Sequence, residues 1–152
     1  MPASSVGTYT QIPDFITDSD EYKGLEYAEM VTLIYLLKSM KRDSNGMLSF
    51  PVSIAESIGM DNTTRRRCLR KLERAGIILK TAKHNGKNPD MYAVFWRPFK
   101  PNNDAVSEKI GVFREWSNRQ RLHFKRYFLG EKIPDGLKVL TVNHPQYESS
   151  TL

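Results

Sequence analysis

Apolar residues recur at helical spacing in several stretches of the chain. The first stretch runs from residue 22 or 25 to 40 and is apolar on nearly every side between 30 and 37, a pattern typical of a helix buried on more than one side. It predicts either the centre of the domain or a subunit interface. The longest stretch, 104–129, is apolar along one side and stops before Gly130, which predicts a long C-terminal helix.

Residues 51–76 predict two short helices joined by a tight turn. Pro51 stands where a first helical residue is favoured, and Gly59 ends the first helix. Asp61 is placed to cap the second helix, which runs to residue 75 and stops at Gly76. At 100° per residue this second helix has two different sides. Its apolar side consists of Cys68, Leu69, Leu72 and Ala75, and its opposite side of Thr63, Arg66, Arg67, Arg70 and Arg74.

Two stretches rich in β-branched and aromatic residues follow, at 77–83 and 90–96. The loop between them has Asn85-Gly86 at its head, which predicts a β-hairpin with a basic tip. Shorter strands are predicted at 47–50, after an Asn45-Gly46 turn, and at 137–142. Tyr9, Ile12 and Phe15 alternate with polar residues and predict an extended arm on the core. The fold class is therefore α+β and mainly helical.

Composition divides the chain into five parts. Residues 1–8 are expected to form a loose tail, 9–97 the main domain, 98–103 a linker, 104–130 the C-terminal helix, and 131–152 a second tail that contains the last short strand. With 152 residues and 39% hydrophobic composition, the chain can bury a core of its own.

Charge is unevenly distributed along the chain. The net charge is +6 and the pI about 9.5. Residues 14–29 hold six acids and one lysine, whereas 65–74 hold six bases and one acid. The molecule should therefore be basic where the second helix of the pair lies, which favours a polyanionic partner.

Several classes of protein are disfavoured. The longest apolar run is far shorter than the roughly 20 residues that span a bilayer, and the polar N-terminus does not look like a signal peptide, so we expect a cytoplasmic protein. A single Cys68 permits no intramolecular disulfide and no cysteine-based zinc site. His84, His123 and His144 lack ligand spacing, and no glycine-rich phosphate loop follows a strand. We expect no enzymatic activity, no cofactor and no metal.

The order of these elements resembles a winged helix-turn-helix. The passage LERAGII at 72–78, together with IGMD at 58–61, is similar to bacterial regulators of that class, and IPDF at 12–15 resembles the opening of phage and plasmid replication initiators. The resemblance covers about residues 9–97. It implies a three-helix core with a β-hairpin wing, to which this chain adds its C-terminal helix.

In that class the second helix enters the major groove of DNA and the wing touches the minor groove or backbone. The matching positions in the helix are Asn62, Thr63, Arg66, Arg67, Arg70 and Arg74, and those at the wing are Lys83, His84 and Lys87. Arg and Asn can pair with base edges, and the helix N-terminus can hold a phosphate. Arg65 departs from the pattern because it occupies an inner position that is usually apolar. Its head either extends outwards or pairs with an acid of the first helix.

The resemblance implies a sequence-specific protein that binds double-stranded DNA as a homodimer and controls transcription of a plasmid, phage or other mobile-element operon. A replication initiator, or another DNA-organising protein, that marks origin repeats is the nearest alternative. A winged helix used only for protein contact is a third.

The C-terminal helix has two candidate uses. Its apolar side either covers the domain or pairs with a second subunit, and we favour pairing because the side is unusually aromatic. The candidate interface residues are Phe113, Trp116, Phe124 and Tyr127.

Overall fold

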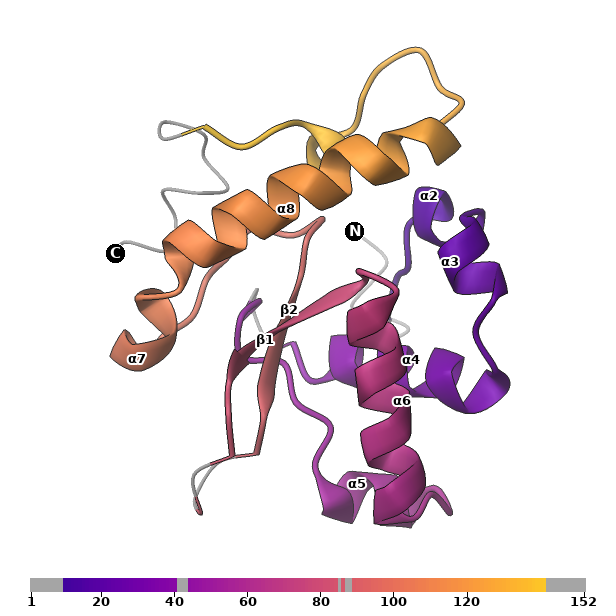
Figure 1. Cartoon of the computed structure of the whole chain (residues 1–152), viewed down its shortest axis with the longest axis vertical. Helices are drawn as coiled ribbons and strands as arrows, with labels where there is room; N and C mark the ends of the chain where they lie inside the picture. Colours follow the sequence, from indigo (N-terminus) through magenta and orange to yellow (C-terminus); the bar gives the residue numbers. More distant parts are fainter. Residues whose placement is uncertain (1–9, 41–43, 85, 87–88, 142–152) are drawn as a thin grey trace, which may run out of the picture.

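The computed structural model describes residues 10–40, 44–84, 86 and 89–141, and within them the fold is α+β and mainly helical. The α-helices are α2 (Asp14–Thr17), α3 (Asp20–Lys23), α4 (Tyr27–Lys38), α5 (Val52–Ser57), α6 (Asn62–Arg74), α7 (Asp104–Ser107) and α8 (Ile110–Phe124). Two 3-10 turns, η1 (Lys125–Tyr127) and η2 (Asp135–Leu137), follow α8, and strands β1 (Ile78–Ala82) and β2 (Met91–Val94) form a hairpin. In Figure 1, α4 crosses behind α6, the hairpin lies beside α6, and α8 passes over the upper end of both.

The predicted pair of helices is present as α5 and α6. The side chain of Asp61 accepts a hydrogen bond from the backbone N–H of Thr64 at 2.8 Å, which satisfies a donor at the start of α6. Cys68, Leu69 and Leu72 are buried along one side of α6, as the helical spacing predicted. Gly76 has a φ of 77°, a left-handed conformation that ends the helix with little strain in a glycine.

Helix α4 is the layer behind α6. It begins at Tyr27, later than the apolar pattern suggested, because Glu26 and Glu29 form a reciprocal capping box there. Leu33, Leu36 and Leu37 are buried. The helix packs on α6 and lies at the centre of the domain, which is one of the two positions that its apolar surface predicted.

The hairpin is antiparallel, with Ile78 opposite Val94 and an irregularity after Lys80. The predicted strand at 47–50 is reduced to a single bridge between Leu48 and Tyr92. Beyond this bridge a side chain takes the place of a strand. The buried amide of Asn45 donates to the carbonyl of Val94 at 2.8 Å and accepts from its N–H at 2.8 Å. The backbone of 45–46 can therefore turn away while the edge of β2 remains hydrogen-bonded.

The C-terminal helix shares one core with the rest of the chain. Phe95 at the end of β2 contacts Trp116 and Phe124 of α8, with ring centroids 6.1 and 5.0 Å apart. Phe99 stacks on Phe113 at 4.6 Å, so the predicted linker 98–103 contributes to the core instead of separating two units.

A polar contact also joins α8 to the end of α6. The Gln120 side chain donates from Nε2 to the Gly76 carbonyl at 3.0 Å. A Cβ on Gly76 would stand 2.2 Å from that nitrogen, so the contact depends on the glycine.

Three predicted elements differ in the structure. The described part of the arm at 9–15 ends in helix α2, where the adjacent Phe15 and Ile16 are both buried, whereas an extended chain would point them to opposite faces; Tyr9 lies outside the described residues. The helix at 104–129 is interrupted at Lys109, whose ψ of 7° is not helical, and its α-helical part ends at Phe124. The apolar spacing continues across the break, so periodicity could not reveal it. The described part of 137–142 contains no strand; η2 ends at Leu137, and the chain beyond it bonds to side chains of α8.

Candidate nucleic-acid interface

One side of α6 is exposed and basic. Cys68, Leu69 and Leu72 anchor the opposite side in the core, which fixes the orientation of the helix. The predicted recognition residues are all exposed: Asn62, Thr63, Arg66, Arg67, Arg70 and Arg74. The structure therefore brings these six side chains together on one accessible surface, which we call the α6 basic face.

The first turn of the α6 basic face is organised by Asp61. Hydrogen bonds from the backbone and side chain of Thr64 hold the pKa of the Asp61 carboxyl below its usual range. The cap is therefore ionised at neutral pH and complements the helix dipole. It also places a negative charge beside Asn62 and Thr63, so a phosphate approaching this turn would meet an acid as well as N–H groups.

Arg67 is the one member of the face with an ion pair to a neighbouring helix among the pairs that the structure describes. Its Nη2 lies 3.7 Å from Oε1 of Glu26, the N-cap residue of α4. The two side chains are 56% and 71% exposed, so the pair is weakly held and a polyanion could compete for Arg67.

Arg65 does something that neither sequence interpretation anticipated. Its Nη1 donates to the backbone carbonyl of Phe50 at 2.8 Å, and its Nε donates to Oδ1 of Asn62 at 2.9 Å. Phe50 immediately precedes α5, so Arg65 fastens α6 to the segment that enters its companion helix. A backbone carbonyl is invisible to residue pattern, and the only sequence signal was a charged residue at an inner helical position.

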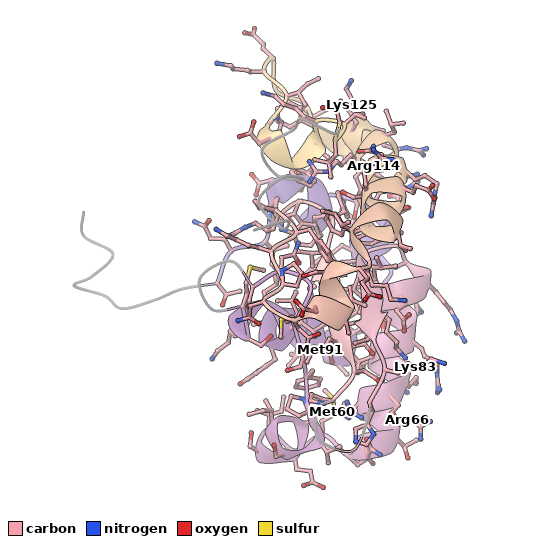
Figure 2. The ribbon with its side chains drawn as sticks, turned by 90° about the vertical axis from the view of Figure 1, so that its left-hand side faces the viewer. Met60, Arg66, Lys83, Met91, Arg114 and Lys125 are labelled. Carbon is pink, nitrogen blue, oxygen red and sulfur yellow. The ribbon has the colours of Figure 1, made fainter. Side chains whose placement is uncertain are left out.

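The hairpin presents the second group of predicted residues. Lys83 and His84 are exposed at the end of β1, while Lys87 lies outside the described residues. The backbone N–H of His84 donates to Oδ1 of Asp90 at 2.6 Å, and Lys80 lies 3.4 Å from the other oxygen of Asp90. In Figure 2 Arg66 and Lys83 lie along the same side of the molecule.

The candidate dimer residues of α8 are placed differently from what we favoured. Phe113, Trp116 and Phe124 are buried against the chain's own core, and Tyr127 is half-buried. The interpretation in which the apolar side of this helix covers the domain is therefore the correct one. These aromatics are not available to a second subunit, because the hairpin and the segment around Phe99 already occupy that side.

Sequence reasoning missed two polar clusters on α8. Arg121 is fully buried, and its guanidinium donates to the carbonyls of Asp135 and Lys138 at 2.6 and 3.0 Å and also to that of Phe95. Its Nε donates to Ser117 Oγ at 2.8 Å. Burial lowers the pKa of Arg121 to about 10, and the nearby Asp135 opposes that shift. The group remains ionised at neutral pH.

The second cluster joins α3 to the end of α8. The Nε2 of His123 lies 2.5 Å from Oε2 of Glu21, and the Tyr127 hydroxyl donates to Oε1 of Glu21 at 3.0 Å. Burial raises the pKa of Glu21, but hydrogen bonds from His123, from the backbone and from Tyr127 outweigh it and leave the pKa lowered. These partners lie about 100 residues apart in the chain, so no local pattern could show them.

Two further searches bear on other kinds of site. Among the described residues, no three His, Cys, Asp or Glu side chains are grouped as a metal ion would need. No helix in the described ranges combines the length and apolarity required to cross a membrane.

Comparisons with known proteins found no matching family model, no similar curated protein and no similar solved structure.

Proposed function

We propose that this chain is a winged helix-turn-helix protein that binds double-stranded DNA in a sequence-specific manner. The observation that carries the proposal is the α6 basic face, in which six exposed polar or basic residues stand opposite a buried apolar side. The order of elements supports it, because α4, the bridge at Leu48, α5, α6 and the hairpin follow one another as they do in that class. Leu48 pairs with the second hairpin strand, which gives the sheet the three-part form that a wing requires.

The chemistry of the face suits a duplex. Thr63, Arg66 and Arg70 are exposed on the first half of α6, where a helix laid in a major groove would meet base edges. Asn62 is held by Arg65 through its side-chain oxygen, which leaves its amide nitrogen to donate to a base or a phosphate. Lys83 and His84 would contact backbone or minor groove from the hairpin. Arg74 lies at the far end of the helix and would meet phosphate at most.

The experiment is a titration of random-sequence and selected duplexes at several salt concentrations. Arg66→Ala and Arg70→Ala should each weaken binding, and each lost phosphate contact should reduce the slope of log K against log salt by about one. Lys125→Ala is the matched control, because it removes one exposed charge at the end of the molecule opposite Arg66 (Figure 2). Equal losses in all three variants would mean that only net charge matters, and unchanged binding in the two Arg variants would refute the assignment of the α6 basic face.

The biological role we favour is transcriptional control of a plasmid, phage or mobile-element operon by a cytoplasmic homodimer. A replication initiator would use the same contact, so mapping separates the two roles. A bound site overlapping a promoter supports control of transcription, whereas tandem sites within an origin support initiation. A winged helix that serves only protein contact would show no duplex binding that depends on Arg66 or Arg70.

A further inference from the structure

The outer side of α8 carries a stripe of exposed residues that its role in the core does not use. The stripe consists of Val112, Glu115, Arg119 and Leu122, and its two apolar members are 54% and 61% exposed. It lies opposite Ser117, which is fully buried against the chain's own core. The spacing of three, four and three residues keeps the four side chains on one line of the helix.

The order of residues in this α8 stripe is palindromic in chemistry. It reads apolar, acidic, basic, apolar. If a second α8 is laid antiparallel about a two-fold axis level with Ser117, Val112 faces Leu122 of the second copy and Glu115 faces Arg119. Symmetry repeats both contacts, so the stripe is complementary to itself in charge and in apolar character.

The geometry of packed helices agrees with this alignment. Alternating steps of three and four residues form the seam of helix pairs that cross at about 20°. Just outside α8, Glu108 and Arg126 stand in the same relation about residue 117 and are also exposed. The inference does not depend on them, because Glu108 precedes the break at Lys109 and Arg126 belongs to η1.

We propose that the α8 stripe is the surface on which a second copy of this chain docks, as an antiparallel α8 pair. An unrelated partner would need no palindromic order, whereas a two-fold homodimer needs it. The helix has 15 residues and is about 22 Å long, which is short for a surface of about 800 Å² per partner. The dimer is accordingly weak, and it dissociates further as salt screens the paired charges.

The pairing is tested by sedimentation equilibrium of the full chain without DNA. Glu115→Arg sets two arginines against each other twice per dimer, and Arg119→Glu does the same with acids, so each should weaken dimerisation about tenfold or more. The double variant Glu115→Arg with Arg119→Glu restores both attractive pairs and should recover the parent's dimerisation. Glu56→Arg makes the same charge change on the exposed side of α5 and should have no effect. A parent that stays monomeric at about 1 mM, single variants that match the parent, or a double variant as weak as the singles would each overturn the proposal.

Cross-linking tests the register independently. Chains with Val112→Cys and Leu122→Cys, mixed and oxidised, should form the mixed disulfide in preference to either symmetric one, because positions 112 of two paired chains lie about 15 Å apart along the helix. The parent, whose only cysteine, Cys68, is buried, is the control. Preferential formation of the symmetric 112 product would refute an antiparallel pair centred at Ser117. Neither test uses DNA, so its outcome is separate from that of the proposed DNA binding.

Discussion

Replacing Arg121 should be among the most destabilising single changes in the chain. Its fully buried guanidinium supplies hydrogen bonds to the carbonyls of Phe95, Asp135 and Lys138, and so joins the end of the hairpin to the segment beyond α8. Three lost hydrogen bonds at about 1 to 1.5 kcal/mol each give about 3 to 4.5 kcal/mol. This is a large share of the 5 to 15 kcal/mol by which a domain is typically stable.

Two variants separate lost hydrogen bonds from lost volume. Arg121→Ala removes both, whereas Arg121→Met keeps most of the apolar volume and removes only the donors. We expect the methionine variant to recover less than half of the loss, because the three carbonyls still lack a partner. Urea unfolding followed by tryptophan fluorescence measures both, since Trp96 and Trp116 lie in the adjoining aromatic cluster.

The result that would refute this reasoning is a methionine variant as stable as the parent. Replacement of buried charged groups by apolar ones of similar size is sometimes neutral, because the charge no longer has to be desolvated. Such a result would mean that burial of the Arg121 charge costs as much as its hydrogen bonds contribute.

Two further predictions follow from the contacts of Glu21 and Arg65. Because the pKa of Glu21 is lowered in the folded chain, its contribution to stability is complete above its ordinary pKa of 4.5 and is lost as pH falls through the folded pKa; unfolding free energies measured between neutral and acidic pH should therefore fall less steeply for Glu21→Gln, and an identical slope would exclude this carboxyl. Arg65→Ala should lower the free energy of unfolding by about 1 kcal/mol, since the Phe50 carbonyl can partly hydrate, and should weaken DNA binding by loosening the angle between α5 and α6. Binding that is unchanged after this loss of stability would show that Arg65 does not position the recognition helix.

Local signals in the sequence were enough for the elements nearest the proposed DNA contact. Asp61 caps α6, Gly76 ends it, and Cys68 and Leu72 face the core because helical spacing alone decides those features. The hairpin followed from strand-forming residues on either side of an Asn-Gly loop. Each of these signals lies within a few residues of the structure that it forms.

Long-range partners were beyond prediction for a common physical reason. A surplus of aromatic residues on α8 looked like an interface, because periodicity shows which side of a helix is apolar and not what covers it. The partners, Phe95 and Phe99, belong to a segment that composition suggested was a strand end and a linker. Likewise Asn45 looked like half of a turn, although its amide completes the edge of β2 from 49 residues away.

The hydrogen bond from Gln120 to the carbonyl of Gly76 gives α8 a part in spacing as well as in packing. Gln120 follows Arg119 directly, so the helix that would meet a second copy is tied by the next residue to the end of α6. If both proposals hold, the separation of the two recognition helices would be set inside the protein before any duplex is met. The pair would then act as a ruler, accepting half-sites at one distance and rejecting the same sequences at another.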